Sequence, residues 1–180
     1  MKYDKIMFWF GLDGTLYNLY QLPNWLERIR NHDASVYEET HCTIKRGLDA
    51  LDFCIRFTCG MFDYAYQSEV GIITSGTKTS TYDFDQEAEQ AKRDWFYGCK
   101  EISLSNMVDK NNFFFIPYGT SKTKVIQDTR GYDPSTLHIL FDSSKEARDE
   151  WKEQGCNYRI INANRNMMKQ LQVLLDRTLD

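Results

Sequence analysis

The sequence lacks any long hydrophobic run. No apolar stretch approaches the roughly 18 residues that a membrane-spanning helix needs. At the N-terminus, a short polar segment leads into only five apolar residues, 6–10, before Gly11. Such a segment is typical of a buried strand and not of a secretory signal peptide. We therefore expect a cytoplasmic protein that does not associate with membranes.

Histidine and cysteine are scarce and dispersed. The three histidines and five cysteines show no metal-ligand spacing, and no Cys-x-x-Cys pair occurs. His41 and Cys42 are the only adjacent pair, and neighbouring side chains on a helix point in different directions. We expect reduced thiols, with neither a zinc site nor a catalytic cysteine.

The chain has no strong excess of charge of one sign. Its formal net charge is −4, and acidic and basic residues are mixed along the sequence. This balance argues against a surface that wraps a nucleic-acid polymer, although it allows a local basic pocket. Repeats, low-complexity stretches and flexible linkers are also missing, so we expect one domain over residues 1–180.

The sequence does contain a regular alternation of short apolar runs and helical patterns. This alternation predicts a Rossmann-like α/β fold, a mostly parallel sheet of about five strands flanked by helices, with ligands at the carboxyl ends of the strands. The predicted strands are 5–10, 70–74, 112–116, 137–141 and 158–162. The predicted helices are 22–31, 42–57, 85–97, 119–129, 144–154 and 165–177, with Ser143 as the cap of the fifth.

The connection 17–67 is long for a single crossover. We interpret its first half as a small helical cap over the site, with an elaborated crossover that has no gating role as the alternative. Tyr17, Tyr20 and Trp25 of this segment could stack on a base or sugar, or could simply pack the cap on the core.

The apolar run 6–10 leads directly into Gly-Leu-Asp-Gly-Thr-Leu at 11–16. This segment resembles the first motif of the haloacid dehalogenase-like (HAD) phosphatases, an apolar strand followed by Asp-x-Asp-Gly-Thr-Leu. The resemblance implies that Gly11 occupies the place of the nucleophilic aspartate, which is also a magnesium ligand. Asp13 matches the general acid, whose backbone carbonyl is a further metal ligand.

Two phosphate-binding motifs of that family have counterparts further along the chain. The strand 70–74 ends in Thr74, which matches the family's phosphate-binding hydroxyl, and Ser75 would supply the next backbone N–H. In the run Gly-Thr-Ser-Lys, Lys122 matches the lysine that neutralises phosphate and carboxylates at a helix start, where anions are favoured. Lys124 is the alternative, and we expect it to be solvent-exposed.

The last motif of the family is a strand that ends in one or two acids that hold magnesium. The run 138–142 ends in Asp142, which matches the first acid, whereas Ser143 stands where many relatives carry a second. A helix cap is the structural alternative for Asp142. The segments 16–20, 23–26 and 118–122 and the Lys-Arg-Asp-Trp run at 92–95 also resemble small, nucleotidase-like HAD proteins of bacteria and their phages.

The missing carboxylates define what this resemblance implies for chemistry. The family forms a covalent aspartyl-phosphate, and glycine offers no group that could attack phosphorus. Magnesium relies on one or two carboxylates, so we expect Mg²⁺ binding by Asp13 and Asp142 to be weakened or absent. Phosphate binding by Thr74, Ser75 and Lys122 does not depend on Gly11.

Three functions therefore stay open from the sequence, and with them the question of whether the chain is an enzyme. The favoured one is a degenerate HAD-type phosphohydrolase that binds a phosphorylated small molecule, with a nucleotide as first candidate, and turns it over little or not at all. The second is an active magnesium-dependent phosphomonoesterase of the 5'-nucleotidase type. The third is a protein-interaction role on a vestigial fold, with 57–66 as candidate patch.

Overall fold

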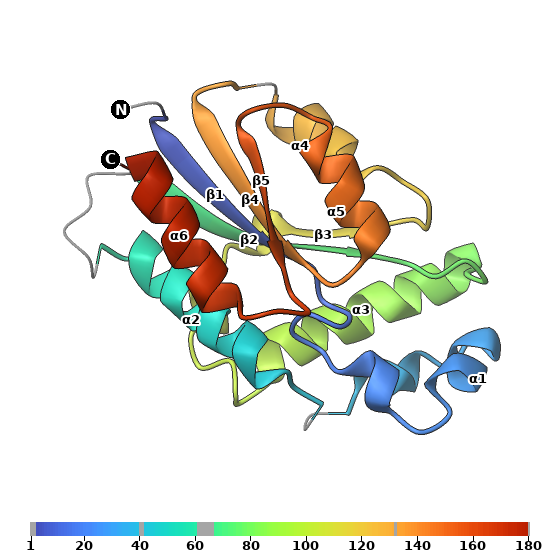
Figure 1. Cartoon of the computed structure of the whole chain (residues 1–180). Coiled ribbons are helices and arrows are strands. Elements are labelled where there is room, and N and C mark those ends of the chain that lie inside the picture. The colour runs from blue at the N-terminus through green and yellow to red at the C-terminus, as the bar shows by residue number, and fades with distance from the viewer. Residues whose placement is uncertain (1–2, 40–41, 61–66, 132, 180) are drawn as a thin grey trace.

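The computed structural model describes residues 3–39, 42–60, 67–131 and 133–179. Its centre is a parallel sheet of five strands in the order β3-β2-β1-β4-β5 (Figure 1). The strands are β1 (Lys5–Phe10), β2 (Gln67–Ser75), β3 (Phe113–Ile116), β4 (Thr136–Asp142) and β5 (Tyr158–Asn162). The predicted Rossmann-like α/β class is confirmed.

Six α-helices lie within the described ranges. They are α1 (Trp25–Arg30), α2 (Lys45–Thr58), α3 (Tyr82–Gly98), α4 (Lys122–Arg130), α5 (Lys145–Lys152) and α6 (Met167–Leu179). Every predicted strand and helix boundary lies within three residues of the observed one. In the same ranges, no helix has the length and apolar character to cross a membrane.

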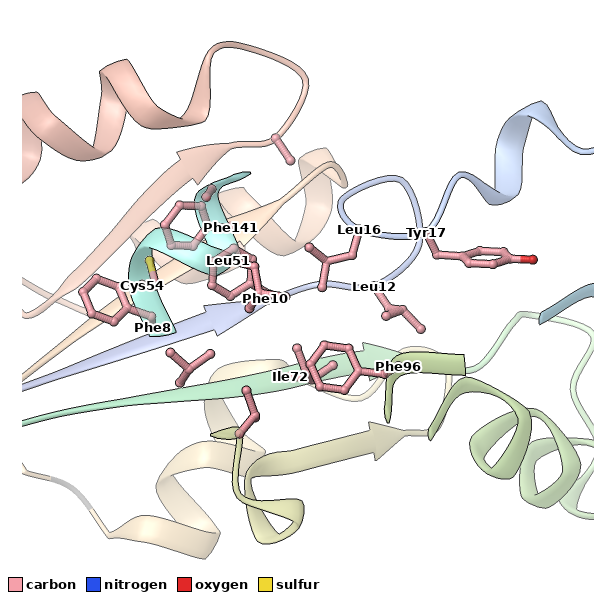
Figure 2. Packing of buried hydrophobic residues seen from close by; sticks show 14 of the residues in the cluster. Phe8, Phe10, Leu12, Leu16, Tyr17, Leu51, Cys54, Ile72, Phe96 and Phe141 are labelled. Atoms are coloured by element: carbon pink, nitrogen blue, oxygen red, sulfur yellow. The ribbon is translucent and has the colours of Figure 1, made fainter. Parts of the chain in front are cut away.

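The central strands are apolar throughout because both faces of the sheet are covered. On one face, Phe8 and Phe10 of β1 pack with Leu51 of α2 and Phe96 of α3 in the larger core cluster (Figure 2). Phe10 stacks on Phe141 of the adjacent β4, with ring centroids 4.2 Å apart.

The opposite face carries a smaller apolar cluster. Trp9 and Leu140 of the sheet pack there with Ile126 of α4 and Trp151 of α5. Helices α2, α3 and α6 thus cover one face of the sheet, and α4 and α5 cover the other (Figure 1). The loops at the carboxyl ends of β1, β2 and β4 emerge between these two layers.

The connection from β1 to β2 has two structurally different parts. The short 3₁₀ helices Leu19–Gln21 and Ala34–Tyr37, together with α1, lie beyond the sheet, and the second of the 3₁₀ helices contacts α3 (Figure 1). Helix α2 instead packs on β2 and α6 as an ordinary crossover helix. The cap therefore comprises residues 19–37, and its gating role stays a prediction.

Candidate functional site

A pocket of about 300 Å³ lies where the loops after β1, β2 and β4 meet. Neighbouring parallel strands bring their carboxyl ends to one edge of the sheet, so these loops converge there. The site residues predicted from the sequence all line this pocket: Gly11, Asp13, Thr74, Ser75, Lys122 and Asp142. A wider hollow of about 940 Å³ lies at the start of β2 and contains none of them.

Gly11 lies beside Asp142. Its backbone N–H donates to the Phe141 carbonyl at 2.8 Å, which continues the β1–β4 pairing by one residue. A Cβ atom built on Gly11 would lie 2.7 Å from Asp142 Oδ2 and 3.4 Å from Thr15 Oγ1. The Asp142 carboxylate therefore already occupies part of the space that a side chain at position 11 would need.

Asp13 is held in an ion pair with Lys92, a residue that sequence reasoning did not assign to the site. Lys92 Nζ lies 2.8 Å from Asp13 Oδ2 and also donates to Thr74 Oγ1 at 3.1 Å and to the Ser75 carbonyl at 3.0 Å. The ammonium group further lies 4.6 Å from the centre of the Tyr37 ring. Lys92 has no exposed surface and joins the loop after β1 (residues 11–16, the first loop) to the end of β2.

The signal for Lys92 was present in the helix pattern. Ala88, Trp95 and Phe96 lie four residues before and three and four residues after Lys92, and all three are buried. Residues at these spacings share one face of a helix, so Lys92 lies within the apolar stripe of α3. A lysine in such a stripe is rarely buried without a charged partner, and that partner here is Asp13.

Lys122 and Asp142 form the second ion pair of the site. Lys122 Nζ donates to Asp142 Oδ2 at 2.6 Å and to the Ile73 carbonyl at 3.1 Å. The other carboxylate oxygen, Oδ1, accepts from the Ser144 backbone N–H at 2.8 Å. Asp142 thus has a partner on each oxygen, and both side chains of the pair are at least nine-tenths buried. Lys124 is exposed, as expected.

The start of α4 differs from the sequence expectation. Glu150 of α5 accepts hydrogen bonds from the Thr123 backbone N–H at 3.1 Å and from the hydroxyls of Thr123 and Ser121 at 2.7 and 2.6 Å. Burial alone would raise the pKa of Glu150, but these hydrogen bonds outweigh it and hold the pKa below its usual value. An internal carboxylate thus occupies the helix start that we expected to attract phosphate.

The prediction that Ser143 caps the following helix is wrong. Ser144 is the cap of α5, because its hydroxyl accepts from the Ala147 backbone N–H at 3.3 Å. The Ser143 hydroxyl instead donates to the Asp13 backbone carbonyl at 3.0 Å. This is the carbonyl oxygen that the HAD resemblance assigns to the metal.

The residues present fit a magnesium ion poorly. Magnesium requires near-octahedral oxygen coordination that includes one or two carboxylates. Here both Asp142 oxygens, the Asp13 carbonyl and Asp13 Oδ2 all accept hydrogen bonds from protein donors. Over the described ranges, no group of three or more His, Cys, Asp and Glu side chains gathers as a possible metal site.

The rim of the pocket is aromatic. Tyr20 and Trp25 of the cap line it and meet edge to face, with ring centroids 5.3 Å apart. Partial burial, with the nearby charges of Asp13 and Asp142, raises the pKa of Tyr20 to about 12, so its hydroxyl stays protonated. Tyr17 is fully buried and packs on Trp95 at 4.8 Å, so it belongs to the core and cannot stack on a ligand.

Two buried polar groups of the loop after β1 are unsatisfied. Asp13 Oδ1 and Thr15 Oγ1 are buried and have no hydrogen-bond partner in the described structure. Buried polar groups without a partner are rare in folded proteins, because losing water costs about 1–3 kcal/mol for each. Both atoms lie in the loop after β1, next to Gly11, and Asp13 lines the pocket whereas Thr15 does not.

Comparison with protein-family models, with curated proteins and with solved structures finds no match for this chain. The similarity to the HAD phosphatases is therefore a resemblance in the order and spacing of the motifs alone.

Proposed function

We propose that this protein binds a phosphorylated small molecule in the pocket around Gly11 and turns it over little or not at all. In this proposal the chain is a HAD-type phosphohydrolase whose site is degenerate because the nucleophile is missing. The carrying observation is that Lys122, Thr74 and the loop after β1 line one pocket and keep hydrogen-bond donors without a protein acceptor, while Gly11 leaves the pocket without an attacking group.

A count of donors supports the binding of an anion. The Lys122 ammonium has three N–H donors, and two of them are used by Ile73 and Asp142. Thr74 Oγ1 already accepts from Lys92, so its own hydroxyl proton is available to a ligand. In the described part of the chain, the backbone N–H groups of Leu12 and Asp13 donate to no backbone carbonyl. These four donors suit a phosphate oxygen cluster.

The same geometry argues against rapid turnover. Gly11 has no side chain, and the nearest carboxylate, that of Asp142, is held by Lys122 and the Ser144 N–H. The Asp13 side chain is held through Oδ2 by Lys92, so it is not free to replace the missing attacking group. Loss of a nucleophile from a catalytic constellation costs several orders of magnitude in rate.

The size and rim of the pocket favour a ligand with a flat or sugar-like group attached to phosphate. About 300 Å³ is at the small end of ligand pockets, enough for a compact phosphate ester. Tyr20, Trp25 and the exposed Tyr118 present aromatic surface at the entrance. A nucleoside monophosphate is the first candidate of this kind.

No observation favours the alternative of an interaction surface at 57–66. Phe57 of that segment is buried and packs on Phe8, with ring centroids 5.6 Å apart. Residues 61–66 lie outside the described residues. The active phosphomonoesterase stays a competing proposal, and an assay can decide it.

The test is calorimetric titration with a panel of phosphate monoesters, run beside a phosphate-release assay. We expect at least one ester to bind and none to be hydrolysed at a measurable rate. Lys122→Met should weaken binding by about tenfold or more, because it removes a ligand donor and unpairs Asp142. Lys124→Met is the matched control on the same helix and should leave binding unchanged, because Lys124 is exposed.

Each outcome separates the competing functions. Hydrolysis by the parent protein at an ordinary enzymatic rate would support the phosphomonoesterase. An absence of binding by the whole panel would remove the proposed function. Equal losses in Lys122→Met and Lys124→Met would show that the ligand binds elsewhere.

A further inference from the structure

Two carboxylates line the pocket, and each forms an ion pair with a buried lysine. Lys92 with Asp13 and Lys122 with Asp142 have N–O distances of 2.8 and 2.6 Å. Both lysines are buried, and the formal charges of the four groups cancel. Gly11 adds no charge between them.

The geometry points to a site that binds phosphate groups without any divalent cation, because Lys92 and Lys122 supply the positive charge that a metal ion would otherwise supply. This inference rests on the proposed function, since it concerns how the same pocket holds its ligand. In this arrangement Lys92 positions the Thr74 hydroxyl and neutralises Asp13, whereas Lys122 contacts the phosphate directly.

A divalent ion would have to compete with existing interactions. Two of the oxygens that it would need, Asp142 Oδ2 and the Asp13 carbonyl, already accept hydrogen bonds from Lys122 and Ser143. It would also place two positive charges beside two buried ammonium groups in a cluster that is already neutral. Like charges that lie close together repel strongly where water is excluded.

A phosphate group can enter without breaking these bonds. Lys92 uses all three of its N–H donors on Asp13, Thr74 and Ser75, and it does not line the pocket. Its effect on a ligand is therefore indirect: it neutralises Asp13, which would otherwise repel phosphate, and it orients the Thr74 hydroxyl. Lys122 lines the pocket and keeps one unused N–H.

The first test is a titration of the parent protein with inorganic phosphate, once in EDTA and once with excess magnesium chloride. We expect the dissociation constants in the two buffers to agree within about twofold, which is well below the tenfold change that would indicate a role for magnesium. Melting temperature should rise with phosphate and should not rise with magnesium chloride alone.

Two different results would overturn the inference in distinguishable ways. Phosphate that binds only with magnesium, or about tenfold more tightly with it, removes the metal-free site and leaves the proposed function standing. If neither phosphate nor any ester of the panel binds under either condition, both the metal-free site and the proposed function are wrong.

The second test is Lys92→Met, which keeps the apolar stem and removes the charge. The cluster then carries one net negative charge, so phosphate affinity in EDTA should fall by about tenfold or more, and magnesium should now restore part of it. A merely structural role for Lys92 would lower affinity or stability without creating a response to magnesium. Lys100→Met, an exposed lysine just after α3, should behave like the parent in both buffers. If Lys92→Met does not fold, the magnesium response of the parent still decides the inference.

Discussion

Introducing a carboxylate at position 11 should make the folded protein depend on magnesium. The Cβ of a residue at this position would lie 2.7 Å from Asp142 Oδ2 and 3.1 Å from its Cγ. In Gly11→Asp, a third carboxylate therefore joins Asp13 and Asp142, while the two neutralising lysines remain the same. The Asp142 side chain must also shift, although Lys122 and the Ser144 N–H hold its two oxygens.

The expected cost follows from the charges and their spacing. Two carboxylates about 4 Å apart repel by about 4 kcal/mol at the effective dielectric typical of proteins. The Lys122 ammonium, 2.6 Å from Asp142 Oδ2, offsets part of this repulsion. Protonation of one carboxyl limits the cost, since neutralising an aspartate at pH 7 requires about 4 kcal/mol. We expect Gly11→Asp to lose about 2–3 kcal/mol of unfolding free energy in EDTA.

Magnesium should reverse this loss, because it binds the folded state through the new cluster. A concentration of about 100 times the dissociation constant would add about 2.7 kcal/mol. The measurement is urea denaturation of the parent and of Gly11→Asp, each in EDTA and in magnesium chloride. Gly11→Asn is the matched control, since it has the same shape and no charge, and Gly11→Ala isolates the contact of the Cβ with Asp142.

The reasoning would be refuted if Gly11→Asp and Gly11→Asn were equally stable in EDTA, because the charge at position 11 would then not lie beside Asp142. A phosphate-release assay on the same proteins adds a functional reading. Activity that appears only in Gly11→Asp with magnesium would indicate a pocket that kept its binding geometry and lost its attacking group.

Three further predictions concern the core and the buried charges. Burial lowers the pKa of His138 to about 4 from its ordinary 6.5, so between these values the unfolded chain binds a proton that the folded chain does not. Stability should therefore fall as pH is lowered from 6.5, by about 2 kcal/mol at pH 5, and urea denaturation of His138→Gln should lack this slope. Phe10→Ala removes the ring stacked on Phe141 and should cost about 3–5 kcal/mol in the same assay, whereas a loss under 1 kcal/mol would contradict the packing. Lys92→Met alone should cost about 3 kcal/mol because it unpairs Asp13, and adding Asp13→Leu should recover most of that loss, which additive costs in the double variant would disprove.

Sequence reasoning located the strands and the loops because their signals are local. A run such as 137–141 is apolar at every position, and this pattern fits a strand covered on both faces. The motif residues Thr74 and Asp142 lie at the carboxyl ends of their strands, as the second-last and last residue, so their meeting at one edge of the sheet follows from the parallel topology alone.

The parts that sequence reasoning missed depend on contacts between distant residues. Lys92 meets Asp13 across 79 positions, and Glu150 meets the start of α4 from 27 positions beyond Thr123. A helix pattern shows that Lys92 faces inward, but it does not show which carboxylate lies opposite. At Ser143 and Ser144 either hydroxyl suits a helix cap, and only the path of the loop past Asp13 decides between them.

The energetics of these ion pairs bear on the proposed function. Burying a lysine and a carboxylate together costs desolvation energy that their attraction roughly offsets, so apolar residues of similar size would stabilise the fold equally well or better. Lys92, with no exposed surface, and Lys122 therefore contribute little that the fold itself requires. Phosphorus chemistry does not account for them either, since Gly11 offers no nucleophile. The proposed recognition of an anion would account for them, because a phosphate group requires at close range an ammonium group with an unused donor, as Lys122 has, and a hydroxyl oriented by a second ammonium group, as Thr74 is by Lys92.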